Sequence, residues 1–228
     1  MEEDILKELK SVSNPKKAKV LQWFFKTGKG EYGEGDIFVG IVIPDLRKIA
    51  KKYSKVVVLD DLNPFIRSEI HEYRMFTLLT LTYMPLSKGV YDFYMKNLKY
   101  VNNWDLVDIT TPNIVGRYLK DKDRSILYEL AKSENLWKQR VSIMATFAFI
   151  KEGDFQDTLA MAEILVHHKH DLIHKAVGWM LREIGKKDLA VEEKFLKQYY
   201  KEMPRTMLRY AIERFEETKR QAYLKGEI

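Results

Sequence analysis

Trp104 and Asp108 stand four residues apart near the middle of the chain, and these two side-chain types could do chemistry together. If the stretch is helical, they lie one turn apart on the same face. An indole face attracts a cation, and a carboxylate stabilises positive charge or positions water. The pair therefore raises the question of what an indole and an acid on one helical face are for.

Structural roles are the competing interpretation of these residues. A single tryptophan in a helix usually belongs to the core, and this reading applies to Trp104 and to Trp179. Asp108 could pair with Arg140 in a salt bridge between neighbouring repeats, and Arg140 could itself be structural. Both kinds of role can hold together.

The composition indicates a helical protein with a sizeable core. Of 228 residues, 46% are hydrophobic, and only 6 Pro and 11 Gly occur, which favours long helices over many-turned β architecture. The formal net charge of +6 permits a polyanionic partner without demanding one. The absence of cysteine excludes disulfides, thiolate metal sites and cysteine nucleophiles.

Neither the N-terminus nor the longest apolar run resembles a signal peptide or a membrane span. The acidic start, Met1-Glu2-Glu3-Asp4, differs from a signal peptide, and the longest apolar run, residues 37–44, is too short to span a bilayer. We expect a soluble cytoplasmic protein.

Apolar spacing predicts helices along nearly the whole chain. Asn14 is suited to cap a helix that has Pro15 at its first position. The 3.6-residue rhythm predicts one helix over 63–84, another over 88–98 and a longer one over 104–119. Closely spaced helices then follow at 123–133, 136–151, 155–168, 172–185, 191–201 and 206–224.

A glycine-rich segment, residues 27–36, separates the early helices. It contains Gly28-x-Gly30-x-x-Gly33, but a dinucleotide fingerprint needs a strand before it and a helix after it. Here a helix comes first and the β-branched run 37–43 follows. A surface loop that could touch a ligand is the better interpretation.

Polar residues recur within the apolar helices at intervals of 31–35 residues, which is typical of stacked helical hairpins. They are Arg74, Asp108, Arg140, Lys175 and, more weakly, Thr206. The sequence therefore predicts an all-α, HEAT-like or ARM-type α-solenoid forming one domain over residues 1–228. Equivalent positions would line a basic concave groove suited to the phosphates of a duplex.

Histidines cluster at 167, 168, 170 and 174, but their spacing fits no familiar zinc motif, and a solvated helix junction is the better interpretation. Glu69 and Glu72 are expected to form pairs on or between helices.

Several motifs resemble those of the DNA alkylation repair family, and the likeness covers most of the chain. The glycine-rich segment 27–36 is similar to the family's N-terminal region. The central and C-terminal motifs are Asn103-Trp104-Asp105-x-Val107-Asp108, Trp137-x-x-Arg140 and Lys175-Ala176-x-Gly178-Trp179-x-x-Arg182-Glu183. Members of the AlkD type are HEAT-like solenoids that excise alkylated, positively charged purines.

The resemblance implies specific roles. Trp104 and Trp179 match the cleft tryptophans, Asp108 the essential acid, and Arg140 the arginine that binds phosphate. Arg182, Lys175 and Arg74 are further candidates for contacting the DNA backbone, and Asp105 is expected to support its helix or pair with a neighbouring cation. The expected protein is a monomeric DNA glycosylase that acts on double-stranded DNA without a metal or other cofactor.

Two other functions stay open. The glycine-rich segment resembles that of family branches that bind branched DNA with little glycosylase activity, which would make the protein a non-catalytic binder of damaged or branched DNA. The third reading is a HEAT-like protein-interaction scaffold.

Overall fold

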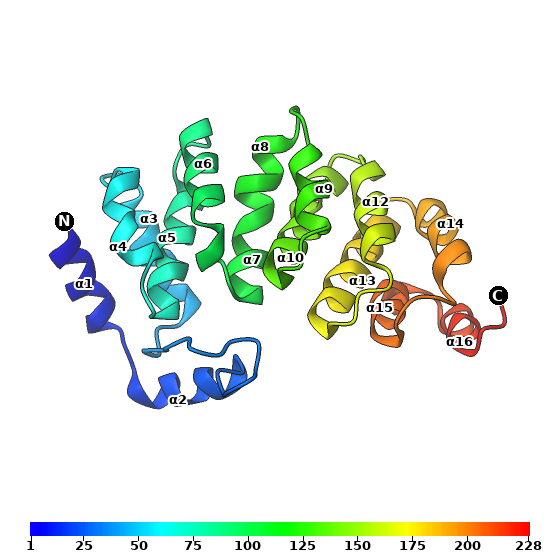
Figure 1. The fold of residues 1–228 in the computed structure, drawn as a ribbon, viewed down its shortest axis with the longest axis horizontal. Coiled ribbons are helices and arrows are strands. Elements are labelled where there is room, and N and C mark those ends of the chain that lie inside the picture. The colour runs from blue at the N-terminus through cyan, green and yellow to red at the C-terminus, as the bar shows by residue number, and fades with distance from the viewer. The chain divides into compact units, whose positions relative to one another are not determined.

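The computed structural model describes all 228 residues, and the chain divides into two compact units, Met1–Thr110 and Thr111–Ile228. Both units are built from helices (Figure 1), and the one β interaction is an isolated parallel bridge between Ile37 and Ile70. The predicted all-α class is therefore confirmed. A single domain with one groove along it stays a prediction.

The first unit contains one helix, α2, that runs crosswise to its neighbours. In Figure 1, α2 runs across the foot of this unit, whereas α3 packs against both α1 and α5. The elements are α1 (Glu2–Ser11), α2 (Pro15–Phe24), α3 (Ile43–Tyr53), η1 (Leu59–Leu62), α4 (Asn63–Ile66), α5 (His71–Tyr83), α6 (Lys88–Lys96), η2 (Leu98–Tyr100) and most of α7 (Trp104–Thr111).

The start of α2 follows the sequence prediction. The Asn14 side-chain oxygen accepts hydrogen bonds from the backbone N–H groups of Lys16 and Lys17 at 3.0 and 3.1 Å, with Pro15 at the first helical position. These bonds satisfy donors that a helix N-terminus leaves without partners. The predicted cap is confirmed.

The single helix expected over 63–84 is interrupted. α4 ends at Ile66 and α5 begins at His71, because the intervening residues form another structure. The backbone N–H of Ile37 donates to the Glu69 carbonyl, and that of His71 donates to the Ile37 carbonyl. The β-branched run after the glycine-rich loop thus pairs with the chain just before α5, and apolar periodicity alone does not reveal that competition.

α5 is buried on every side from His71 to Leu81, so its polar side chains must find partners inside the protein. Glu72 was expected on a helix surface or in an ion pair. Its carboxylate is buried and accepts the backbone N–H groups of Val39, Gly40 and Ile41, with the shortest bond 2.7 Å long, to Gly40. One carboxylate therefore satisfies an extended segment that no sheet covers.

The second unit shows the predicted hairpin repeat. α10, α13 and α15 pack in succession, while α9, α12 and α14 cover them. Its elements are η3 (Pro112–Gly116), α8 (Arg117–Leu119), α9 (Ser125–Ala131), α10 (Leu136–Ala145), α11 (Phe147–Ile150), α12 (Gln156–Leu165), α13 (Asp171–Gly185), α14 (Leu189–Tyr199), α15 (Arg205–Ala211), η4 (Ile212–Arg214) and α16 (Glu217–Lys225).

Close helix contact in this unit depends on Gly178 in α13. A Cβ at this position would collide with the Met207 carbonyl oxygen on α15. A glycine lets the two helices approach at the backbone, so the Ala-x-Gly-Trp motif has a packing reason beside any functional one.

The helix predicted over 104–119 contains a π-helical turn. α7 continues into η3, which begins at Pro112, and then into α8. Proline has no N–H to donate and disturbs the regular helical ladder, which accounts for the wider turn at this place. No helix of the protein has the length and apolarity that crossing a membrane requires.

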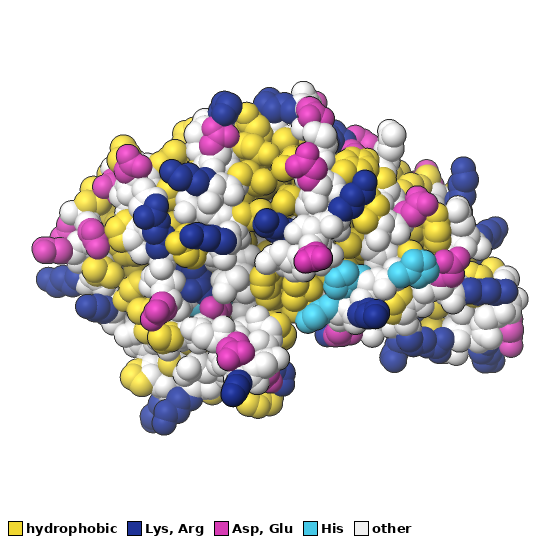
Figure 2. Space-filling view, in the orientation of Figure 1, with side chains coloured by type: hydrophobic (Ala, Val, Ile, Leu, Met, Phe, Trp, Pro, Cys, Tyr) yellow, Lys and Arg dark blue, Asp and Glu magenta, His cyan; other side chains and the backbone are white.

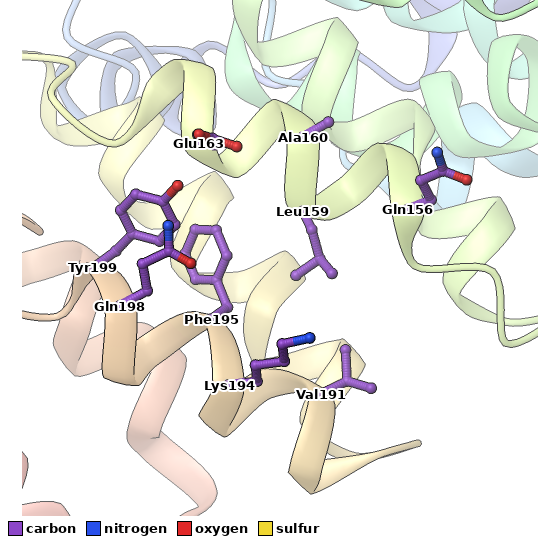
Figure 3. Close-up of a pocket in the computed structure, with 9 residues that line it drawn as sticks. All are labelled: Gln156, Leu159, Ala160, Glu163, Val191, Lys194, Phe195, Gln198 and Tyr199. Atoms are coloured by element: carbon purple, nitrogen blue, oxygen red, sulfur yellow. The ribbon is translucent and has the colours of Figure 1, made fainter.

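A surface pocket of about 500 Å³ lies between α12 and α14, where Leu159 and Phe195 point toward one another's helix (Figure 3). Glu163 and Tyr199 also line it. None of the residues expected from the sequence to act in catalysis or DNA binding lines it.

Candidate functional site

Trp104 and Asp108 both lie on α7, four residues apart and half-buried. The start of this helix is fixed by its own neighbours: the Asn103 side-chain oxygen accepts the Trp104 backbone N–H at 2.8 Å, and Asp105 accepts that of Leu106 at 2.8 Å. The sequence prediction that the pair shares one helical face is met by this geometry.

Directly beside Trp104, Asp105 joins a buried chain of charges. His71 Nε2 lies 2.9 Å from Asp105 Oδ2, and His71 Nδ1 lies 3.1 Å from Asp36 Oδ2. Both ring nitrogens therefore face carboxylates, an arrangement that suits an imidazolium donating two hydrogen bonds. The expectation that Asp105 pairs with a neighbouring cation is confirmed, with histidine as that cation.

Arg74 completes the chain. Its guanidinium donates to Asp36 Oδ1 at 2.6 Å and to the Ser68 carbonyl at 2.8 Å. We expected Arg74 on a stripe facing phosphates, but it is buried within α5 and directed at Asp36. A buried guanidinium needs a compensating charge, and Asp36 supplies it. Two cations and two carboxylates together make the cluster neutral.

The pKa values reflect this pairing. Burial alone would lower the pKa of His71, but the charge and hydrogen bond of Asp105, with the hydrogen bond to Asp36, raise it to about 9. Burial would raise the pKa of Asp36, yet the His71 hydrogen bond and the Arg74 charge hold it below its ordinary value. At neutral pH the imidazolium form is therefore stabilised.

The glycine-rich loop delivers Asp36 to this cluster. Glu31 accepts the Gly28 N–H at 2.9 Å, and Glu34 accepts the Gly30 N–H at 2.8 Å. A Cβ at Gly33 would collide with the Phe25 carbonyl oxygen, so glycine is needed where the loop returns to α2. The loop is thus held in shape by its own side chains. At its end it places the Asp36 carboxylate in the buried cluster.

An aromatic column connects the charge cluster to Trp104. Phe25 stacks on Trp104 with ring centroids 5.2 Å apart and on Phe38 at 4.9 Å, and Phe38 stacks on His71 at 4.4 Å. Phe24 meets the same indole edge-on at 6.1 Å. One face of Trp104 is therefore covered by Phe25, and its orientation depends on α2 and on His71.

In the second unit, Arg140 and Lys175 already have partners. Arg140 is buried, and its guanidinium donates to the Leu172 carbonyl at the start of α13. Lys175 lies 2.6 Å from Asp171 in a half-exposed pair one turn apart on α13. Arg140 therefore has a structural contact, and a phosphate contact stays a prediction for both residues.

Trp179 and Arg182 lie in a network on the same helix. The Trp179 indole N–H donates to Glu183 Oε1 at 3.0 Å, and the ring lies 6.1 Å from that of Phe147. Arg182 pairs with Glu213, and its Nε lies 3.8 Å from Glu183 Oε1. The carboxylate of Glu183 thereby holds the indole from its nitrogen side.

The histidines at 167–174 lie at the start of α13, where most of them form hydrogen bonds with the backbone. His170 accepts the Leu172 N–H at 3.1 Å as the helix cap, and His168 accepts the His170 N–H at 3.0 Å. Nowhere in the chain do three or more His, Asp or Glu side chains gather in a way that could hold a metal ion.

Sequence reasoning missed His71 and Asp36 as members of the site. A usable signal existed: His71 and Asp105 are 34 residues apart, the same interval that separates Arg74 from Asp108. Because repeat-equivalent positions on neighbouring helices adjoin, that register predicts the His71–Asp105 contact. Nothing in the register indicates Asp36, which comes from a loop.

Comparison with models of known protein families shows which family this chain belongs to. The profile described as "DNA alkylation repair enzyme" matches residues 5–215. The chain belongs to this family. Family membership supports a role in the repair of alkylated DNA, with DNA as the binding partner. A comparison with curated proteins finds no match.

Solved structures show the same fold. A predicted DNA alkylation repair enzyme from Enterococcus faecalis is 18% identical, with a TM-score of 0.69 over 90% of this chain and 97% of that one. AlkD2 from Streptococcus mutans is 17% identical, with a TM-score of 0.57 over 88% and 97%. At this identity the likeness establishes the HEAT-like repeat architecture and leaves the chemistry to the residues.

Proposed function

We propose that this family member is a DNA glycosylase that excises N3- and N7-alkylated, positively charged purines from duplex DNA. The observation that carries the proposal is the pair on α7, where Trp104 and Asp108 stand one turn apart and half-buried. Membership of the DNA alkylation repair family supports alkylated DNA as the substrate.

The chemistry suits these side chains. A cationic alkylpurine leaves as a neutral base, so the enzyme needs no acid to protonate it, and the deoxyribose becomes oxocarbenium-like. An indole face stabilises such a cation by roughly 0.5–2 kcal/mol. The Asp108 carboxylate would stabilise it further and position or deprotonate the water that attacks C1′. Trp179 is the second indole proposed for this role. No step requires a metal.

The first unit supports the proposal through positioning. His71 ties Asp105 to Asp36, and the column of Phe38 and Phe25 continues to the Trp104 ring. His71, held by charge-assisted hydrogen bonds to Asp36 and Asp105, restricts the motion of the start of α7. Trp104 and Asp108 therefore lose little conformational freedom when substrate binds. His71 is thus a positioning residue in this proposal.

DNA backbone contacts are proposed for cations of the second unit. Arg140 would hold a phosphate bidentately, with Lys175 and Arg182 contributing nearby charge. Each has a protein partner at present, namely Leu172, Asp171 and Glu213. Phosphate binding would therefore exchange or share these partners.

Single-turnover incubation with a duplex that carries one N7-methylguanine tests the activity. Wild-type protein should release the base above the spontaneous rate, and Asp108→Asn should lose that release. Asp92→Asn, which removes an exposed carboxylate paired with Lys88 on α6, is the matched control and should retain it. No release above the spontaneous rate by wild type overturns the enzyme proposal.

A second candidate function is non-catalytic binding of damaged or branched DNA. The observation that favours it is the Phe25 ring on the face of Trp104, because a covered indole face is not available to a sugar cation. Tight binding to a four-way junction without base release would support this function over the first. A protein-interaction scaffold predicts neither result.

A further inference from the structure

α2 has two apolar faces, and the fold accounts for only one. Ala18 and Phe25 are buried and pack with Phe38, and Leu21 and Trp104 join them at the edge. The opposite face, which we call the outer face of α2, points to solvent. It is formed by Val20, Trp23 and Phe24, whose side chains are 63%, 74% and 52% exposed.

The spacing of Val20, Trp23 and Phe24 is i, i+3, i+4, so the three form one continuous surface. No other tryptophan of the chain is as exposed, since Trp137 is buried and Trp104 and Trp179 are half-buried. Contiguous exposed apolar side chains of this size mark a binding surface more often than scattered ones do.

The charged residues of α2 itself are all of one sign. The helix contains Lys16, Lys17 and Lys19 and no acidic residue. Lys26, just beyond it, holds a φ of 56° and places its Nζ 5.6 Å from the centroid of the Trp23 ring. In the glycine-rich loop that follows, Glu31 and Glu34 accept hydrogen bonds from the backbone N–H groups of Gly28 and Gly30. Figure 2 shows dark-blue and yellow side chains side by side over α2.

We propose that the outer face of α2 binds unpaired bases in DNA, with Trp23 and Phe24 stacking on the bases and the lysines contacting the flanking phosphates. Aromatic rings interleaved with cations are the arrangement that holds single-stranded nucleic acid, because every base offers a flat face to stack on. This inference rests on the proposed DNA-directed function and adds a second recognition element to it.

Two features favour DNA over other occupants. A second copy of the chain meeting this face would bring lysines against lysines, which is repulsive. Phe24 also meets Trp104 edge-on at 6.1 Å, so a ligand on the outer face lies next to the proposed catalytic helix. Unpaired bases occur beside a distorted lesion or at a branch point, which suits both candidate functions.

Fluorescence anisotropy with two labelled DNAs of equal length tests the proposal. One is a fully paired duplex, and the other carries a three-nucleotide bulge. Trp23→Ala should weaken binding to the bulged DNA by roughly fivefold or more, because stacking contributes about 1–3 kcal/mol per base. Binding to the paired duplex should change by less than about twofold, since the phosphate contacts remain.

Matched variants separate stacking from charge and from folding. Trp23→Phe should restore most of the bulge preference, and Tyr83→Ala, which removes an exposed aromatic ring at the end of α5, should leave it unchanged. Lys16→Gln with Lys19→Gln should weaken binding to both DNAs and lower the salt dependence by about two phosphate contacts. Equal loss on both DNAs for Trp23→Ala, or no loss, overturns the proposal.

Two further measurements, of vesicle binding and of base release, distinguish failure of this inference from failure of the proposed function. If wild type binds phosphatidylglycerol vesicles through Trp23 and shows no preference for bulged DNA, the face is a lipid-binding surface and the proposal is overturned. Base release from the N7-methylguanine duplex is assayed in parallel. If bulge binding depends on Trp23 and no base is released, this inference is upheld and the glycosylase proposal is overturned. If base is released and binding does not depend on Trp23, the glycosylase proposal is upheld and this inference is overturned.

Discussion

His71 Nε2 lies 2.9 Å from Asp105 Oδ2, and this contact joins two helices at positions 34 residues apart in the chain. It ties the buried core of α5 to the residue that follows Trp104. The other ring nitrogen faces Asp36, which carries Arg74 on its second oxygen. The helix that bears the proposed catalytic pair therefore begins in a neutral, buried ion cluster rather than in apolar packing alone.

Replacing His71 with Asn should change how stability depends on pH. The pKa of His71 is raised from 6.5 to about 9, so the native protein keeps a proton that the unfolded chain loses. The stabilisation is complete below pH 6.5 and is lost as pH rises to about 9, with an upper limit of about 3 kcal/mol. Urea unfolding of wild type and variant at pH 6 and pH 9 measures it.

The wild type should lose stability across that window, and His71→Asn should start lower and stay nearly level. His167→Asn, at an exposed histidine, is the control and should follow wild type. Parallel curves for wild type and His71→Asn would show that the cluster does not hold the proton.

Phe25→Ala should loosen Trp104 and destabilise the protein. Phe25 is buried between Phe38 and Trp104, and truncating a buried phenylalanine costs roughly 3–5 kcal/mol. Thermal unfolding measures the loss, and a red shift of tryptophan emission reports the uncovered indole. Phe24→Ala, at the neighbouring half-exposed ring, should cost much less. Equal costs would mean that the column does not stabilise the unit.

Arg140→Ala separates a phosphate contact from a structural one. Under the proposed function, the variant should bind DNA more weakly, with a salt dependence lower by about one phosphate contact. The lost hydrogen bond to the Leu172 carbonyl should also cost about 1 kcal/mol or more of stability. Binding is therefore measured where circular dichroism shows both proteins folded. An unchanged salt slope in folded protein would assign Arg140 to the structure alone.

Glu192→Gln should stabilise the protein near pH 8. Burial, with the neighbouring charge of Glu193, raises the pKa of Glu192 to about 8, and its Oε1 has no hydrogen-bond partner. The unfolded carboxyl ionises near 4.5, so wild type loses stability as pH rises from 4.5 to 8, and glutamine removes this loss. Urea midpoints at pH 5 and pH 8 measure it; Glu216→Gln at an exposed site is the control. A wild-type midpoint independent of pH over this range would contradict the prediction.

Local signals in the sequence were sufficient to predict where most of the helices lie. Asn14 with Pro15 predicted the start of α2, and the 3.6-residue rhythm predicted most of the helices. Capping and periodicity act over a few residues, so they can be recognised without the fold. The break before α5 escaped this reasoning, because the residues that interrupt the helix pair with Ile37, far away in the chain.

The sequence by itself determined the helical repeat, the family and the Trp104–Asp108 spacing on one helix, since spacing and motif depend only on neighbours along the chain. Only the tertiary structure decided which charges face solvent and which face each other. Arg74 matched the cationic stripe by register, yet its burial in α5 makes Asp36 its partner. The cost of burying a charge depends on what the fold brings beside it, and Asp36 and His71 reach that place from separate segments.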